Sequence, residues 1–491
     1  MVCAVLLFPL LASFATRGNS YVVTSTSQGL LKGKIETVEG KTVEAYQGIP
    51  YAHPPVGHLR FRKPVPSESW NGTYDATHPK HSCIQPRFSV IFIVPTDLSE
   101  DCLYLNVWTT GPKRPLKPVL VWIHGGAFKF GSSHERWYNG AALAALNDVV
   151  VVSFNYRLGM LGFFDSGDET APGNVGLWDQ NLALRWVRQN IENFGGDPDA
   201  VTVFGESAGA MSIHAHMLSP HSEGLFTRAF LLSGTLSTNT PVDSLFDSVD
   251  KGNDVAKQLG CADAYRDLTT HPREVVGCLR TKDPDAIHRA SEEAAGHKAT
   301  NFLPSFKNEF LPTLPSQATA KKEYRRLDTL ISATADEGAF GAIFQPDQRW
   351  LVEDLADFDD AGFQTSAQYL ANSWCPNRVA HIARSYVETA SSGGKQAVRK
   401  AVIDFVGDIY FKCPTMVFNE QHSDVGGKSY AFVFGYRSAK YPFPEFFGVP
   451  HTSDIPYYFG APFLDTEAYT DEDRKFSRKA MDMFVSFAKT G

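Results

Sequence analysis

The sequence of 491 residues lacks several features of membrane, fibrous and nucleic-acid-binding proteins. After residue 20, no stretch is long and apolar enough to span a bilayer, and there is no internal repeat or low-complexity tract. Positive charge is not in excess, because the formal net charge is -8, and this argues against nucleic acid as a partner. No cysteine and histidine cluster has zinc-site spacing. What remains is an ordinary globular composition, with 43% hydrophobic and 20% charged residues.

A linker rich in proline, serine or glycine is also absent, so we expect one domain over residues 21–491. Residues 1–20 differ from the rest. The apolar run Met1–Leu11 is too short to cross a membrane, and small residues follow it. This pattern predicts a secretory signal peptide, cleaved between about Ala15 and Ser20, and therefore a secreted, extracellular protein.

Cysteine usage agrees with secretion, because an even number remains once Cys3 leaves with the signal peptide. Two local pairs stand out by their spacing, although the count alone cannot fix the pairing. In a chain that enters the secretory pathway, the sequon at Asn71 predicts an N-glycosylation site. The six remaining cysteines are Cys83, Cys102, Cys261, Cys278, Cys375 and Cys413.

Six short runs of β-branched and apolar residues are typical of strands buried on both faces of a sheet. Helical stretches at Leu177–Asn193 and Ser207–Leu218 lie between some of them. This alternation predicts an α/β fold, with a mainly parallel central sheet and helices on both faces. Residues 20–65 read as antiparallel strands, and residues 241–326 as a helical insertion after a sheet strand. The six runs are residues 119–123, 149–154, 201–204, 229–232, 327–331 and 429–434.

The most informative motif is Gly205-Glu206-Ser207-Ala208-Gly209, which lies between a predicted strand and a predicted helix. GxSxG alone is weak, since roughly 0.2 chance matches are expected in such a chain. Its position between a predicted strand and a predicted helix makes the match more significant. A sharp turn there holds the serine in a strained conformation, and small neighbours let strand and helix approach closely. Ser207 is therefore the candidate nucleophile.

A second motif, His124-Gly125-Gly126-Ala127, directly follows the predicted strand at residues 119–123. Small residues allow backbone N–H groups to face the oxyanion that forms when a serine attacks an ester carbonyl. Its position upstream of GxSxG is the order expected for this kind of site. Gly126, Ala127 and Ala208 are the candidate donors.

A nucleophilic serine needs a histidine base and a carboxylate that orients it, in the chain order serine, acid, histidine. After the predicted strand at residues 327–331 comes a turn with Asp336 and Glu337, and a later loop carries His451. Composition alone does not choose Glu337 over Asp336, nor His451 over His422.

These motifs together resemble the type-B carboxylesterase and cholinesterase family, over about residues 20–491. The resemblance implies the α/β-hydrolase fold, the triad Ser207, Glu337 and His451, and an oxyanion hole from Gly126, Ala127 and Ala208. It also implies the disulfides Cys83–Cys102 and Cys261–Cys278, a small-molecule ester substrate and no metal or cofactor. The matching segments are residues 46–52, 99–107, 155–159, 176–197, 204–209, 336–338 and 448–451.

The first disulfide loop bears on the choice of ester. In cholinesterases of this family, a tryptophan in that loop binds quaternary ammonium through its ring face. Here the loop contains no tryptophan, and Phe92 stands at the corresponding place among aliphatic neighbours. Phenylalanine is a weaker cation host, so we expect a neutral or lipophilic ester rather than choline. Glu206 stands where juvenile-hormone esterases carry glutamine, which counts against that assignment.

Two alternatives remain beside an active carboxylesterase. One is a non-catalytic adhesion or binding protein of the same fold, since fold does not fix function. Such relatives usually lose a triad member, whereas all three are present here. The other is a true cholinesterase. Family members usually continue for some tens of residues past this point, so the resemblance implies a truncated C-terminus. Nothing in the sequence indicates an oligomeric state.

Overall fold

The computed structural model describes residues 21–87, 97–237, 241–295, 302–344, 355, 359–374 and 380–491. The predicted signal peptide, Phe92 and Cys375 lie outside these ranges.

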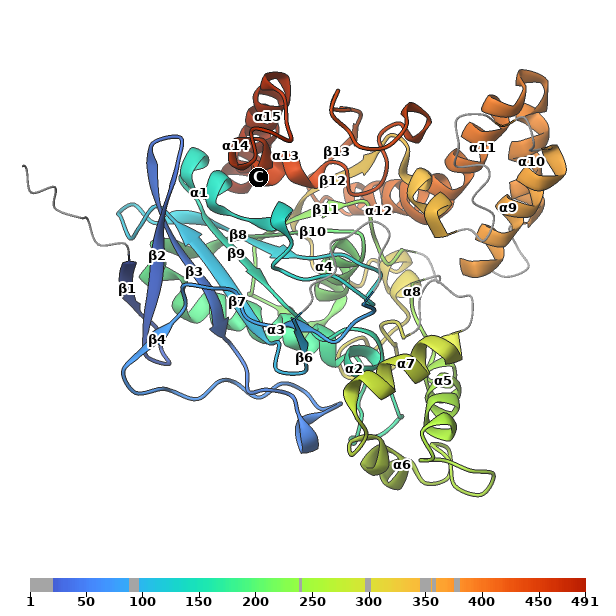
Figure 1. The fold of residues 1–491 in the computed structure, drawn as a ribbon, viewed down its shortest axis with the longest axis horizontal. Helices are drawn as coiled ribbons and strands as arrows, with labels where there is room; N and C mark the ends of the chain where they lie inside the picture. Colours follow the sequence, from blue (N-terminus) through green and yellow to red (C-terminus); the bar gives the residue numbers. More distant parts are fainter. Residues whose placement is uncertain are drawn as a thin grey trace, which may run out of the picture.

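The centre of the molecule is an 11-stranded sheet, which runs across Figure 1 from β1 to β13. Its order is β1-β2-β3-β7-β9-β8-β10-β11-β12-β13, and β4 pairs with β2 in addition. Along this order, each strand from β1 to β9 is antiparallel to the next. Each strand from β9 to β13 is parallel to the next. The predicted α/β-hydrolase architecture is therefore confirmed. Its strands are β1 (Tyr21–Ser25), β2 (Leu30–Val38), β3 (Lys41–Pro50), β4 (Thr73–Asp75), β7 (Tyr104–Thr109), β8 (Lys117–Ile123), β9 (Val150–Phe154), β10 (Gly196–Glu206), β11 (Arg228–Leu232), β12 (Asp328–Thr334) and β13 (Ser429–Phe434).

The inner strands are apolar on both faces because helices cover both faces. In β8, Val119, Val121 and Ile123 belong to one core and Leu120 and Trp122 to the other. The first core includes α3 (Val175–Asn190) and α4 (Ala208–Leu218), and the second includes α1 (Ala141–Asn147), α13 (Ile455–Phe459) and α15 (Asp471–Thr490). Each such buried side chain stabilises the fold by about 1.5–3 kcal/mol. This double burial explains why the strands lack polar alternation.

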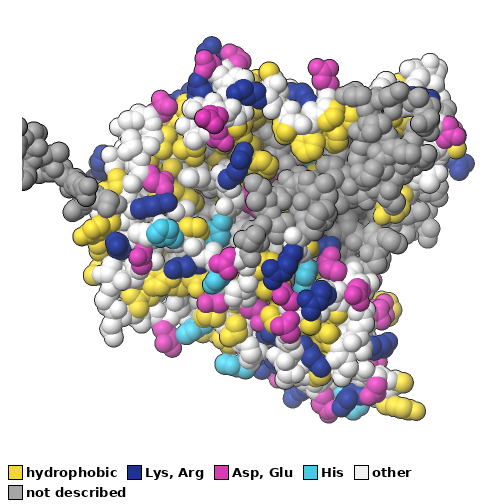
Figure 2. Space-filling view, viewed as in Figure 1, with side chains coloured by type: hydrophobic (Ala, Val, Ile, Leu, Met, Phe, Trp, Pro, Cys, Tyr) yellow, Lys and Arg dark blue, Asp and Glu magenta, His cyan; other side chains and the backbone are white. Residues whose placement is uncertain are grey.

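The predicted insertion forms a helical lobe, at the lower right of Figure 1. A capping box at its start, between Ser244 and Asp247, satisfies backbone N–H groups at the first turn of α5. Figure 2 shows acidic and basic side chains intermixed over this lobe, as on a solvated surface. The lobe contains α5 (Leu245–Gln258), α6 (Pro272–Leu279), α7 (Pro284–Ala295) and α8 (Pro315–Ala320).

A second helical lobe, at the upper right of Figure 1, was not predicted from the sequence. It has a hydrophobic core of its own, which includes Phe363, Val387 and Val402. Its helices are α9 (Asp360–Trp374), α10 (Ala380–Ala390) and α11 (Lys395–Gly407), and a π-helical turn at Asp408–Lys412 leads into α12 (Cys413–Asp424).

The short elements complete the description. Strands β5 (Ser82–Cys83) and β6 (Leu98–Ser99) form a separate parallel pair. The remaining helices are α2 (Gly159–Phe163) and α14 (Ala461–Leu464). Among the described residues, no helix has the length and apolar character needed to cross a membrane.

Candidate active site

Ser207 occupies the sharp turn between β10 and α4. Its backbone has φ 56° and ψ -122°, a strained conformation for a residue with a Cβ. Its N–H donates to the carbonyl of Leu232 on the neighbouring strand, at 2.9 Å, which fixes the turn against the sheet. A Cβ on Gly209 would overlap the carbonyl oxygen of Ile123, so only glycine lets α4 approach β8 this closely.

His451 and Glu337 lie in direct contact. Nδ1 of His451 is 2.6 Å from Oε2 of Glu337, and both side chains are buried. The other carboxylate oxygen of Glu337 accepts hydrogen bonds from the Thr334 N–H at 2.6 Å and the Ser233 hydroxyl at 2.5 Å. The carboxylate is thus held from both sides, which fixes the imidazole orientation.

The two residues that composition left open as alternatives have other partners. Asp336 accepts the backbone N–H of Val449 at 2.9 Å and faces Lys400 at 3.3 Å. His422 makes a hydrogen bond through Nε2 with the Leu327 carbonyl at 2.7 Å. Asp336 therefore ties the loop that carries His451 to the turn that carries Glu337, and His422 is a packed structural residue.

A second carboxylate, which the sequence analysis did not identify, contacts the same imidazole. Oε1 of Glu206 lies 2.8 Å from Nε2 of His451, and both side chains are 2% exposed. Burial alone would lower the pKa of His451, but the charges of Glu206 and Glu337 outweigh it and raise that pKa to about 10. Among the described residues, no hydrogen bond joins the Ser207 hydroxyl to His451. Each ring nitrogen of His451 therefore contacts a carboxylate in this structure.

Asp454, three residues after His451, is a third buried carboxyl group. Burial, and then the nearby charges of Glu206 and Glu337, raise the pKa of Asp454 to about 8. Neither of its oxygens has a hydrogen-bond partner on another described residue. An unpaired carboxylate would be costly at this depth, so the neutral acid is favoured at neutral pH.

The loop after β8 has an unusual backbone. Gly126, Ala127 and Phe128 have φ values of 107°, 54° and 60°, so two non-glycine residues lie in the left-handed region. Within the described part of the chain, the N–H groups of Gly126, Ala127 and Ala208 donate to no other group. Ala208 begins α4, whose N-terminus favours negative charge. These N–H groups remain available as donors.

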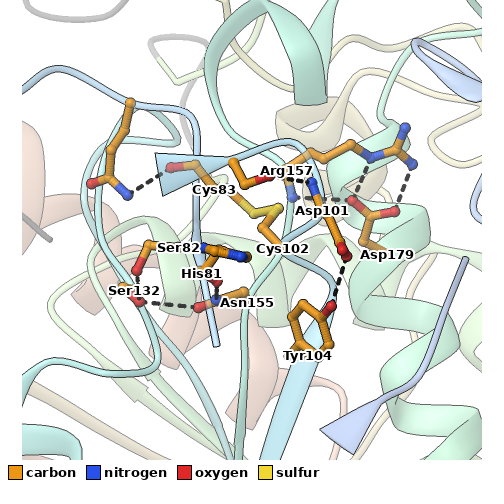
Figure 3. The surroundings of a disulfide bond; sticks show 12 residues. His81, Ser82, Cys83, Asp101, Cys102, Tyr104, Ser132, Asn155, Arg157 and Asp179 are labelled. Carbon is orange, nitrogen blue, oxygen red and sulfur yellow. Dashed lines mark hydrogen bonds and ion pairs between the residues drawn. A yellow bond between two sulfur atoms is a disulfide. The ribbon is translucent and has the colours of Figure 1, made fainter. Parts of the chain in front are cut away.

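The structure contains the two disulfides that the resemblance implies. Cys83–Cys102 lies next to the buried pair of Arg157 and Asp179, whose two charged groups are joined by two hydrogen bonds of 2.6 and 2.7 Å (Figure 3). Close by, the Asn155 side chain accepts from the Ser132 hydroxyl and donates to the carbonyl of His81 (Figure 3). These hydrogen bonds pair the Asn155 amide and the Asp179 carboxylate, whereas Nη1 of Arg157 has no hydrogen-bond partner among the described residues.

Cys261–Cys278 connects the segment after α5 to α6, with a sequence separation of 17 residues. Cys413 is a free, exposed cysteine. Asn71, the predicted glycosylation site, lies in an exposed turn before β4. Among the described residues, no group of histidine, cysteine, aspartate and glutamate side chains could hold a metal ion.

The sheet and the helices that cover it define the α/β-hydrolase class, which includes carboxylic ester hydrolases. The family model of the carboxylesterase family matches residues 20–491, and the chain belongs to that family.

Curated relatives are identical to this chain at about a third of the aligned positions. A cholinesterase of Mus musculus is 36% identical over 490 residues, which cover 96% of this chain and 79% of the relative. An acetylcholinesterase of Bungarus fasciatus is 35% identical, with 95% and 78% covered. An acetylcholinesterase of Leptinotarsa decemlineata is 34% identical, with 96% and 79% covered.

Proposed function

We propose that the chain hydrolyses carboxylic esters through an acyl-enzyme on Ser207, with His451 as the base and Glu337 as the residue that orients it. The observation that carries this proposal is the contact of 2.6 Å between His451 and a doubly anchored Glu337. That contact holds the imidazole with Nδ1 protonated, so that Nε2 is the nitrogen left to take a proton.

The reaction has two steps. Nε2 of His451 takes the proton of the Ser207 hydroxyl as its oxygen attacks the ester carbonyl, and the N–H groups of Gly126, Ala127 and Ala208 stabilise the oxyanion. The proton then passes to the leaving alcohol. Water, activated by the same imidazole, attacks the acyl group and releases the acid. Because Glu206 contacts Nε2 in this structure and the pKa of His451 is raised, His451 must release its Nε2 proton and exchange that contact for Ser207 before the first step.

We propose neutral or lipophilic esters as the substrates. The imidazole of His451 packs against two aromatic rings, with its ring centroid 4.2 Å from that of Phe411 and 5.2 Å from that of Phe340. The substitution of Phe92 for the expected tryptophan supports the same choice. A true cholinesterase is the second candidate, and the names of the three relatives favour it.

One assay tests both candidates. The protein should hydrolyse a short acyl nitrophenyl ester, and Ser207→Ala should lower kcat by a factor of about 10³ or more. Equal turnover by the wild type and Ser207→Ala would contradict the mechanism. No turnover by the wild type would favour the non-catalytic binding protein. Efficient turnover of acetylthiocholine in parallel would replace the neutral-ester proposal with the cholinesterase.

We further propose that residues 21–491 form one catalytic domain, secreted after removal of residues 1–20 and glycosylated at Asn71. Two disulfides support an oxidising compartment, and the exposure of Asn71 supports modification there. A mass shift that disappears both with glycosidase treatment and in Asn71→Gln, in protein collected from the culture medium, would test these points together.

A further inference from the structure

An ion pair joins the loop after β8 to the helical lobe of residues 241–326. Nζ of Lys129 lies 2.6 Å from Oε2 of Glu292 on α7, and the two side chains are only 17% and 30% exposed. Among the described residues, each is the single ion-pair partner of the other. Because partial burial reduces screening by water and salt, this pair is stronger than one on the open surface.

The loop that carries Lys129 also carries two of the candidate oxyanion donors. Ala127 and Phe128 lie in the left-handed region, a backbone conformation that persists only where surrounding contacts hold it. The N–H groups of Lys129 and Phe130 both donate to the carbonyl of Gly126, at 2.9 and 3.0 Å. That carbonyl and the N–H of Ala127 belong to one planar peptide unit. A displacement of Lys129 therefore turns an oxyanion donor.

Two further contacts hold the loop beyond this peptide unit. Gly159 donates its N–H to the carbonyl of Phe128 at 2.7 Å, and the Gln85 side chain bonds to both the N–H and the carbonyl of Gly131. On the side of the lobe, α7 packs against α2 and α5 (Figure 1). Glu292 is thus presented by a helix that is itself packed in place.

We propose that Lys129 and Glu292 are positioning residues, through which the helical lobe aligns the Ala127 N–H of the oxyanion hole. This inference rests on the proposed function, because it gives the pair a role in that reaction. The effect falls on the transition state, since the oxyanion forms only as Ser207 adds to the ester carbonyl. Loss of one donor typically costs about 10²–10³ in rate, and misalignment of a donor should cost part of that.

Single substitutions test the pair in the full chain. Glu292→Gln and Lys129→Met should each lower kcat for a nitrophenyl ester by about 3- to 10-fold, with KM changed by less than about 2-fold. Lys129→Arg keeps the charge and should retain most of the wild-type kcat. The double variant should be no slower than either single variant, because the two changes remove one interaction. Glu293→Gln, at an exposed position one residue further along α7, is the matched control and should leave kcat unchanged.

A matched pair of inhibitors separates the alignment of the oxyanion hole from general damage to the site. An aryl trifluoromethyl ketone accepts the Ser207 oxygen at its carbonyl carbon, the serine proton passes to His451, and the ketone oxygen becomes an oxyanion. Its affinity for Glu292→Gln should fall by the same factor as kcat/KM. The corresponding alcohol has no carbonyl to form the adduct, so its affinity should not change.

Hydrogen exchange gives a readout that does not depend on activity. The backbone amides of Lys129 and Phe130 are protected by their bonds to Gly126, and this protection should fall in Glu292→Gln. Glu293→Gln should exchange at the wild-type rate. Thermal unfolding checks that each variant is folded at the assay temperature.

The outcomes distinguish this inference from the proposed function. Wild-type kcat in Glu292→Gln, or unchanged amide protection there, would overturn the positioning role. Equal losses of activity in Glu292→Gln and Glu293→Gln, or additive losses in the double variant, would also overturn it. No ester hydrolysis by the wild type would instead contradict the proposed function, and the exchange experiment would still show whether Glu292 holds the loop.

Discussion

At the scale of single residues, the contact between Glu206 and His451 makes a direct prediction about pH. The general base must be neutral, and two flanking carboxylates stabilise its protonated form, so activity should rise as pH increases through a high pKa. Glu206→Gln removes one of these charges. The acid limb of the pH profile of kcat/KM should then move to lower pH, by about 1 pH unit or more.

The profile is measured with a neutral nitrophenyl ester from pH 5 to 10. Glu472→Gln is the matched control, because its side chain is 70% exposed on α15. An acid limb at the same pH in wild type and Glu206→Gln would contradict the pairing seen in the structure.

Asp454 gives a second residue-scale prediction, on stability. Its pKa in the folded protein, about 8, lies above its ordinary value of 3.8, so folding keeps a proton that the unfolded chain releases. The contribution of Asp454 to the free energy of unfolding therefore becomes more unfavourable as pH rises from about 4 to 8. Asp454→Asn removes the titration, so its Tm relative to the wild type should be higher at pH 8 than at pH 5. Thermal unfolding at both pH values checks this, and a difference independent of pH would refute it.

The residue scale also shows where sequence reasoning stops. The GxSxG pattern leaves its second position free, so nothing in it predicts that Glu206 reaches the histidine. Likewise, only the family resemblance chose Glu337 over Asp336, since the two are neighbours in one turn. Which of them faces the imidazole depends on the backbone direction there, and the hydrogen bond from Val449 shows that Asp336 points elsewhere.

At the scale of elements, the approach of α4 to β8 can be tested through one glycine. Gly209→Ala should destabilise the fold by roughly 1–3 kcal/mol and lower activity, because the new methyl overlaps the Ile123 carbonyl. Gly277→Ala is the matched control, since a Cβ there meets no atom within 4 Å. Urea unfolding and ester hydrolysis are measured for both variants. Equal free energies of unfolding for Gly209→Ala and Gly277→Ala would show that α4 can shift away from β8 without cost.

The strands and the helical insertion at residues 241–326 were predicted, whereas the lobe of α9–α11 was not. The run at residues 429–434 matches β13, and the run at 201–204 lies within the longer β10. The helix expected over 177–193 is α3 at Val175–Asn190, followed by a 3₁₀ turn. The lobe of α9–α11 was missed because its apolar side chains pack on one another. It therefore lacks the strand–helix alternation on which the prediction of the sheet rested.

At the scale of the whole molecule, the parallel part of the sheet explains why distant residues meet. Gly126 follows β8, Ser207 follows β10, Glu337 follows β12 and His451 comes after β13. The carboxyl ends of parallel strands lie at one edge, so the loops that follow them converge there. The chain order of the motifs was readable from sequence, whereas their convergence depends on a strand order that the sequence does not state.

The turn at Asp336 has a consequence for how the site maintains its alignment. Asp336 bonds to Val449 twice, through its carboxylate and through its backbone N–H, and a Cβ on Gly448 would collide with that carboxylate. The two adjacent acids of this turn thus have different roles. Glu337 orients the imidazole, and Asp336 fixes the loop that carries it. The entropy of placing the loop that carries the histidine is lost once, during folding, so each catalytic cycle requires only the exchange of the Nε2 contact.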